Sequence, residues 1–223
     1  MNGDTFNRLT GLQLENDGHG ALIAQLRPRF ERMANRHENG TAPRAVSADQ
    51  LFQTPPELAA RLVALADLSP GLDVLEPSAG LGRLLNPILA AGCRAYACEI
   101  NQDLAGELFR TFQDVPLLQR DFLTVRPSWE GGGSLIVKPF PGGPVSFDRV
   151  CMNPPFHMRD DIRHIQHARK FLKPGGRLAT LLLDTPHRER ALRHDAASWE
   201  QVPPGTFGKE GTRVATILAT FTT

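Results

Sequence analysis

The sequence predicts an α/β fold built on one seven-stranded, mostly parallel sheet with helices on both faces. Five short apolar segments alternate with helical stretches, at residues 73–78, 94–100, 116–122, 147–153 and 176–184. This alternation is typical of parallel strands joined by crossover helices. The segment 199–223 holds two further strand candidates with no helix between them. It therefore predicts an antiparallel strand that closes the sheet.

Composition narrows the class of protein. The chain has 223 residues, of which 41% are hydrophobic, and this fits one globular domain. Its 25 basic and 24 acidic residues nearly cancel, so net charge indicates neither nucleic acid nor membrane as a partner. No apolar run approaches the roughly 18 residues that a membrane span needs, and the polar start lacks a signal-peptide pattern. We expect a cytoplasmic protein with no membrane partner. The three cysteines lack CxxC spacing, which argues against a disulfide framework or a zinc site.

The chain divides into an N-terminal part, residues 1–50, and a main domain, residues 51–223. The first part is expected to form a polar arm and a helix over 21–37. The main domain should open with a helix over 55–68, because proline suits the first helical turn. A glycine- and proline-rich run, 126–144, predicts an inserted loop beside the substrate, since it follows the third strand.

A glycine-rich turn follows the first expected strand, in LEPSAGLGRLL. Gly80 and Gly82 let the backbone approach a ligand at the carboxyl edge of the sheet. Leu85 stands where a dinucleotide fingerprint has its third glycine, and no GK[ST] follows, so a pyrophosphate is disfavoured. Glu99, at the end of the second strand, is placed to accept bonds from ribose hydroxyls. The expected ligand carries a ribose but needs no phosphate cradle.

These features resemble the class I S-adenosylmethionine-dependent methyltransferases, whose first motif pairs an acid with a glycine turn. Glu76, Gly80 and Gly82 match that motif, and Ser78 stands where many members have their first glycine. The resemblance implies a Rossmann-like fold and S-adenosylmethionine as the cofactor. It also implies that Glu99 and the adjoining Ile100 contact the cofactor.

The fourth strand ends in VCMNPPF, where a polar amide, two prolines and an aromatic ring follow an apolar run. The Asn153 side-chain oxygen and the Pro154 carbonyl can accept hydrogen bonds, and the Phe156 ring can stack on a base. Two acceptors of this kind favour the more tetrahedral nitrogen in methyl transfer to an exocyclic amino group. The motif therefore indicates an amino-methyltransferase.

The motif and its position after the glycine turn are similar to the gamma class of adenine-specific DNA methyltransferases. Two more segments agree with that family, FQTPPELA and Arg120-Asp121-Phe122. The resemblance implies DNA methylation as the activity. It assigns catalysis to Asn153, Pro154 and Phe156. It implies that the residues at the matching positions bind the cofactor: Thr54, Pro55, Glu76, Ser78, Gly80, Gly82, Glu99, Ile100, Asp121, Phe122 and Asn153.

Several alternatives remain open at the level of sequence. The same motif occurs in enzymes that act on bases in RNA or on a protein glutamine, and a catalytically silent cofactor-binding scaffold is a further possibility. Gamma-class enzymes usually add a target-recognition domain, so a protein partner could supply recognition here. The stretch 157–194 holds nine Lys or Arg and four acids, which predicts a basic rim that favours a nucleic acid. His164 and His167 have no third ligand at metal spacing, and no metal is expected.

Overall fold

The computed structural model describes residues 54–127, 140, 142–156, 160–206 and 215–223. All of them belong to one compact unit, Ser47–Thr223. The arm and helix expected in residues 1–50 lie outside the described residues.

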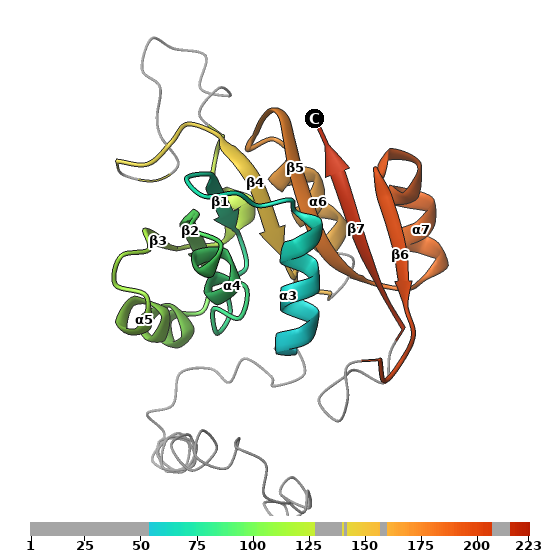
Figure 1. The fold of residues 1–223 in the computed structure, drawn as a ribbon, viewed down its shortest axis with the longest axis horizontal. Coiled ribbons are helices and arrows are strands. Elements are labelled where there is room, and N and C mark those ends of the chain that lie inside the picture. The colour runs from blue at the N-terminus through green and yellow to red at the C-terminus, as the bar shows by residue number, and fades with distance from the viewer. Residues whose placement is uncertain (1–53, 128–139, 141, 157–159, 207–214) are drawn as a thin grey trace, which may run out of the picture. The chain divides into compact units, whose positions relative to one another are not determined.

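A seven-stranded sheet in the order β3-β2-β1-β4-β5-β7-β6 forms the centre of this unit (Figure 1). Only β7 runs antiparallel to its neighbours β5 and β6, and this confirms the predicted fold class. The strands are β1 (Asp73–Glu76), β2 (Arg94–Glu99), β3 (Leu117–Gln119), β4 (Phe147–Met152), β5 (Leu172–Leu183), β6 (Ser198–Val202) and β7 (Thr216–Thr222).

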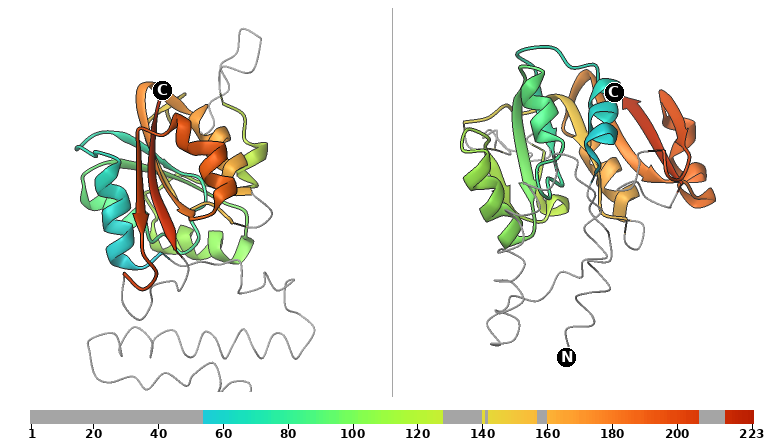
Figure 2. Two further views of the ribbon diagram at one scale, coloured as in Figure 1. Left: turned by 90° about the vertical axis from the view of Figure 1, so that its right-hand side faces the viewer. Right: turned by 60° about the horizontal axis from the view of Figure 1, so that its bottom comes forward.

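Helices cover both faces of the sheet. They are α3 (Pro56–Leu65), α4 (Leu85–Ala90), α5 (Gln102–Thr111), α6 (Asp160–Arg169) and α7 (Pro186–Leu192), with short 3-10 turns η2 (Phe122–Thr124) and η5 (Arg193–Asp195). Figure 2 shows α3 on one side of the sheet and α6 and α7 on the other. Neighbouring strand residues point to opposite faces: Val74 packs with α3 and α4, whereas Leu75 packs with α6. No helix among the described residues has the length and apolar character of a membrane span.

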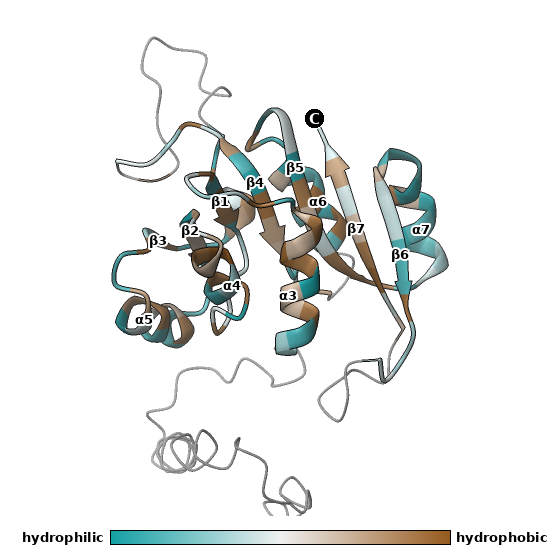
Figure 3. Cartoon of the chain, viewed as in Figure 1, coloured by the Kyte–Doolittle hydropathy of each residue, from teal (hydrophilic) through white to brown (hydrophobic). Residues whose placement is uncertain are grey.

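Hydrophobic residues concentrate in the middle of the sheet, as expected for parallel strands buried on both faces (Figure 3). All four residues of β1 are buried, and so are Val150, Cys151 and Met152 in β4. The outer helices carry their polar residues away from this core, which is clear for α7. The apolar core therefore holds β1 and β4, the two strands that lead into the glycine turn and the Asn-Pro-Pro-Phe segment.

Two strand boundaries differ from expectation. β5 begins at Leu172 because that residue pairs with Phe147, and the ladder resumes only at Arg149 and Arg177. The glycine-containing bulge between these pairs obscured the start of the strand in the sequence. β3 is shorter than predicted because the Asp121 side chain accepts a bond from the Leu123 amide and begins η2.

The connections between strands reverse direction at the centre of the sheet. From β1 the chain moves outward to β2 and β3, and then it returns to place β4 on the other side of β1. The register pairs Val74 with Arg149 and Leu75 with Val150. A crevice opens at the carboxyl ends of the strands where such a reversal occurs, and ligands of α/β folds bind there. Glu76 and Asn153 both lie at this switch point.

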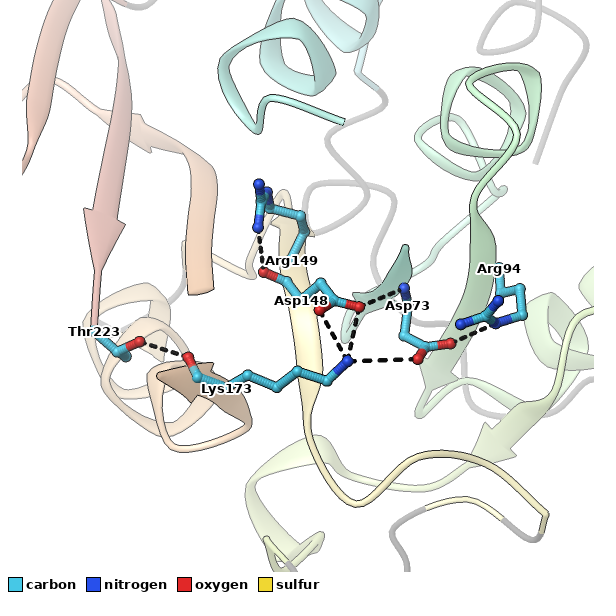
Figure 4. Close-up of polar contacts among 6 residues, drawn as sticks. All are labelled: Asp73, Arg94, Asp148, Arg149, Lys173 and Thr223. Atoms are coloured by element: carbon cyan, nitrogen blue, oxygen red, sulfur yellow. Dashed lines mark hydrogen bonds and ion pairs between the residues drawn. The ribbon is translucent and has the colours of Figure 1, made fainter. Parts of the chain in front are cut away.

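Charged side chains tie the strands together at the opposite, amino edge (Figure 4). The Lys173 ammonium lies 2.8 and 2.9 Å from the two carboxylate oxygens of Asp148. The second of these oxygens also accepts a bond from the Asp73 amide at 2.9 Å. The Asp73 carboxylate in turn accepts a 2.7 Å bond from Arg94. These bonds join the first residues of β1 and β2 to β4 and β5.

The segment 126–144, expected to be a loop beside the substrate, has described residues near both of its ends. Just before it, the Val125 carbonyl lies 2.8 Å from Nε2 of His167, in the last turn of α6. Near its end, the Phe140 ring packs edge-on against Phe147, the first residue of β4, with centroids 5.8 Å apart. Both contacts lie toward the amino edge, because α6 runs back from the carboxyl edge. The rest of the segment lies outside the described residues, so the expectation of a loop beside the substrate stays a prediction.

Replacement of Asp148 by Asn should destabilise the fold by about 1–3 kcal/mol near neutral pH, the usual cost of losing charge-assisted hydrogen bonds. Partial burial disfavours the carboxylate, but bonds from Lys173 and the Asp73 amide outweigh burial and lower the pKa of Asp148. The stabilisation is therefore present above the ordinary pKa of aspartate and is lost as pH falls through the lower folded value. Urea unfolding from pH 7 to pH 3 should show this loss in the wild type and a smaller one in the variant. Asp195→Asn, in an exposed pair with Arg169, is the control and should have a smaller effect. Equal effects of the two changes would contradict the assignment.

Candidate functional site

The glycine turn after β1 has two positions with positive φ, Gly80 at 54° and Gly82 at 73°. A Cβ atom on Gly82 would lie 2.4 Å from the Phe112 ring and 2.9 Å from a methyl group of Leu108. Gly82 therefore lets α5 and the residue after it pack directly against the turn. Nothing lies within 4 Å of a Cβ atom on Gly80, so that position needs glycine for its backbone conformation.

Glu99 joins this turn to the end of β2. Its side chain is mostly buried, with 7% of the residue exposed. One carboxylate oxygen accepts a 2.7 Å bond from the Gly80 amide, and the other accepts a 2.8 Å bond from the Asn101 amide. These bonds fix the direction of the carboxylate. Each oxygen has two acceptor directions, so both can also take a ligand hydroxyl.

Glu76 lies at the end of β1, next to the turn, and is almost fully buried, with 2% exposed. Its Oε2 has no hydrogen-bond partner among the described residues. Burial, and secondly the charge of Glu99, raise the pKa of Glu76 well above the usual value for glutamate. Such a group favours a ligand that brings positive charge, because a nearby cation would stabilise its ionised form.

Asn153 follows β4 and contacts the segment before α3. Its amide nitrogen donates a 2.9 Å hydrogen bond to the hydroxyl of Thr54, which is buried. This bond sets the orientation of the amide, with the nitrogen toward Thr54. Pro55, also buried, accepts the first helical bond of α3 from the Ala59 amide at 2.9 Å. The sequence therefore placed Thr54 and Asn153, which are far apart in the chain, at one site.

The two prolines and the ring complete this strand end. Pro154 is buried, and Phe156 is half-buried and packs against the apolar cluster that includes α3. The Phe156 carbonyl accepts a 3.1 Å bond from Arg188 of α7. Arg188 also contacts Asp161 of α6, and both residues are buried. Sequence reasoning missed this pair, because no motif or spacing marks two residues on separate helices.

The remaining expected cofactor residues differ in their surroundings. Ser78 is half-buried within the turn, and Ile100 exposes 65% of its surface directly after Glu99. Asp121 caps η2 through a bond from Leu123. The Phe122 ring, however, packs against the side chains of His167 and Phe171, with centroids 4.9 and 5.2 Å away. The Phe122 ring belongs to the packing beneath α6, and the residue is 4% exposed. The assignment of Phe122 to the cofactor stays a prediction.

Part of the basic rim expected in 157–194 is neutralised by ion pairs among the described residues. Five of its cations contact acids: Arg163 with Asp160, Arg169 with Asp195, Lys173 with Asp148, Arg188 with Asp161, and Arg193 with Glu189. Lys173, moreover, lies at the amino edge of the sheet (Figure 4). Proximity in sequence overstated the basic surface, since pairing depends on the fold. His164 and His167 also contact backbone carbonyls, those of Asp160 and Val125, each at 2.8 Å.

Comparison with known proteins supports the fold class. The structure is similar to TrmN from Thermus thermophilus, with a TM-score of 0.57, 22% identity, and coverage of 78% of this chain and 50% of that one. A class I S-adenosylmethionine-dependent methyltransferase from Listeria monocytogenes gives a TM-score of 0.54 at 16% identity, covering 80% and 63%. An RNA methyltransferase from Salinibacter ruber in complex with S-adenosyl-L-homocysteine gives 0.51 at 17%, covering 76% and 92%. At these identities the likeness shows the fold.

One curated relative matches in sequence, the ribosomal RNA small subunit methyltransferase A of Thermosynechococcus vestitus. It is 39% identical over 66 residues, which are 29% of this chain and 25% of the relative. The match thus spans about a quarter of that protein's length. No protein-family model matches the chain. Sheet order, antiparallel β7 and these similarities together establish the fold of the class I S-adenosylmethionine-dependent methyltransferases.

Replacement of Glu76 by Gln should make the stability of the unliganded protein depend less on pH. The folded protein holds the Glu76 proton to a higher pH than the unfolded chain, so wild-type stability falls as pH rises above about 4.3, the ordinary glutamate pKa. Glutamine cannot titrate, so the variant should lose less stability than the wild type as pH rises from 4 to 7. Urea unfolding at pH 4 and pH 7 measures the loss in each protein. Glu57→Gln, at an exposed position of α3, is the control. Equal losses of stability in the wild type and the variant between pH 4 and pH 7 would contradict a raised pKa for Glu76.

Proposed function

We propose that the protein transfers the methyl group of S-adenosylmethionine to an exocyclic amino group of a base in RNA, with adenine as the favoured base. The observation that carries the proposal is the placement of Asn153 and Pro154 at the switch point, beside the glycine turn and the carboxylates of Glu76 and Glu99. A cofactor site and an acceptor pair for an amino group thus share one edge of the sheet.

The cofactor-binding residues have the chemistry that S-adenosylmethionine requires. The Glu99 carboxylate is directed by two backbone amides and can accept bonds from the two ribose hydroxyls. Ile100 offers an exposed apolar surface for the adenine ring. Glu76 is a buried acid near the position of the methionine end, where the cofactor carries an ammonium and a sulfonium charge. Asp121 and Ser78 line the same edge, and Thr54 and Pro55 close it from the side of α3.

The chemistry follows from the two acceptors. The amino nitrogen of a base is a weak nucleophile, because its lone pair is delocalised into the ring. Hydrogen bonds from that amino group to the Asn153 side-chain oxygen and the Pro154 carbonyl favour a more tetrahedral nitrogen, whose lone pair can attack the methyl carbon. When bound, S-adenosylmethionine would supply the methyl group, and its sulfur would take the electron pair of the carbon–sulfur bond that breaks. The amino group then loses one proton to solvent. Phe156 can hold the base by stacking.

RNA is favoured over DNA for two reasons. The curated relative is named for ribosomal RNA, and one similar structure is named an RNA methyltransferase. In addition, several cations of the expected basic rim are paired with acids, which leaves fewer of them to bind the phosphates of a duplex while a base is turned out. A base already unstacked in an RNA loop needs less of that binding. The DNA preference suggested by the gamma-class resemblance is therefore replaced by the RNA alternative.

The direct test is methylation by the purified chain with isotope-labelled S-adenosylmethionine. Unmodified total RNA, DNA and a protein extract are offered separately, and nucleoside mass spectrometry identifies the product. We expect a methylated amino base in RNA. Isotope label on a protein glutamine would show that the substrate is a protein. Binding of the cofactor without any methyl transfer would support a catalytically silent scaffold.

Replacement of Asn153 by Ala should separate chemistry from cofactor binding. The methyl-transfer rate should fall about 100-fold or more, by analogy with the loss of one hydrogen bond that acts in the transition state. Affinity for S-adenosylhomocysteine should change little. Single-turnover assays and calorimetry measure the two effects. Thr54→Val, which removes the acceptor of the Asn153 amide nitrogen, should give a smaller loss of rate. Wild-type turnover in Asn153→Ala would reject the amino-transfer mechanism.

Replacement of Glu99 by Ala should lower cofactor affinity at least tenfold, because two charge-assisted bonds to the ribose, roughly 1.5–3 kcal/mol each, are lost. The same change leaves the Gly80 and Asn101 amides without their acceptor, so the variant must first be shown to be folded by circular dichroism. Calorimetric titration with S-adenosylhomocysteine gives the affinity. Asp103→Ala, on the neighbouring helix α5, is the control. An unchanged dissociation constant in a folded Glu99→Ala protein would remove Glu99 from the cofactor site.

A further inference from the structure

We propose that Arg188, held by Asp161, is a positioning residue that sets the backbone of the Asn-Pro-Pro-Phe segment for methyl transfer. This role rests on the function proposed above, but its structural part can be tested without methyl transfer. Neither residue belongs to a motif of the sequence.

The contacts of Arg188 converge from three parts of the fold. Its Nε donates to Asp161 of α6, and its Nη1 donates to the Thr185 hydroxyl at 3.2 Å. Its Nη2 donates to the Phe156 carbonyl at 3.1 Å. The guanidinium group is planar with donors in fixed directions, so the first two bonds determine where the third one points. Lysine, with one compact ammonium group, could not hold three partners in this arrangement.

Stability alone does not explain the pair. Arg188 is 8% exposed and Asp161 is 0% exposed, so both charges have lost most of their hydration. Burial of two charges costs free energy that their attraction often fails to offset, and apolar residues of similar size can be equally stable there. The pair does provide a direction that apolar packing cannot provide. Its donor group is directed at the Phe156 carbonyl, next to the two groups that would accept hydrogen bonds from the amino group.

The Phe156 carbonyl is one of two fixed ends of the segment. At the other end, Asn153 follows the last paired residue of β4 and bonds to Thr54. Between these ends, Pro154 and Pro155 have φ restricted by their rings. A short segment with both ends held and two restricted residues has little freedom. The direction of the Pro154 carbonyl and the place of the Phe156 ring therefore depend on the bond from Arg188. A misplacement of about 1 Å can lower a rate about 100-fold.

The main experiment replaces the ion pair by apolar residues of similar size, Asp161→Leu with Arg188→Met. This double variant should keep a melting temperature close to the wild type, because no charge is left buried alone. It should nevertheless lose at least tenfold in kcat, with affinity for S-adenosylhomocysteine within twofold of the wild type. Arg188→Lys, which keeps the positive charge, should show the same loss of kcat. The matched control is Glu189→Leu with Arg193→Met, an exposed pair between α7 and the residue that follows it, which should leave both quantities unchanged.

Hydrogen exchange provides the readout that does not need turnover. The peptide that contains residues 150–156 should exchange faster in Asp161→Leu/Arg188→Met and in Arg188→Lys than in the wild type, whereas a β7 peptide should be unaffected. Faster exchange with reduced kcat supports the positioning role. A double variant with wild-type kcat and wild-type exchange would overturn it, as would wild-type values in Arg188→Lys if the double variant does not fold. If the wild type methylates none of the offered substrates, the proposed function fails, while the exchange result still decides whether Arg188 fixes the segment.

Discussion

The parallel pairing of β1 with β4 is the constraint on which the candidate site depends. The chain forms β2 and β3 on one side of β1 before it returns to form β4 on the other, and this reversal brings distant residues to one edge. Glu76 ends the first of these strands and Asn153 follows the second. Neither residue could meet the other through local structure. Because both strands are buried on both faces, their register cannot slip without moving charged or polar groups into the core. The core therefore fixes the relative position of the cofactor turn and the amino acceptors.

Glu99 extends this arrangement from the strands to the turn between them. Its carboxylate accepts amides from Gly80 and Asn101, so the glycine turn and the start of α5 are held by the same group that the proposal assigns to the ribose. Gly82 also stabilises the turn, because the absence of a side chain lets Phe112 and Leu108 pack against it. A residue that already orders the turn, and that the proposal also assigns to the ligand, reduces the ordering that binding would otherwise require.

The sequence predicted what local patterns and motifs encode. The alternation of apolar strands and helices gave the sheet and the antiparallel β7, and the motif spacing placed Thr54, Glu76, Glu99 and Asn153 at one edge, where the structure has them. It missed what depends on contacts between distant segments. The Phe122 ring packs under α6, and the described ends of the segment 126–144 lie toward the amino edge of the sheet. Five cations of the stretch 157–194 form ion pairs with acids. The Arg188–Asp161 pair could not be predicted from the sequence for the same reason. The roles of the site residues in binding and catalysis stay predictions.

Buried charge near the site has two forms, and each opposes stability in a different way. Glu76 is a buried acid whose Oε2 has no hydrogen-bond partner among the described residues, so its ionised form is disfavoured until positive charge arrives. Arg188 and Asp161 are buried as a pair, so their charges are compensated but their lost hydration is not fully recovered. At the amino edge, by contrast, Lys173 remains partly exposed and bridges strands at a lower cost (Figure 4). The stabilising charges thus lie at the edge opposite the candidate site. The charges that reduce stability lie at the candidate site, where Glu76 can attract a cation and Arg188 can fix the direction of the backbone. This is expected when function rather than stability selects the residues of a site.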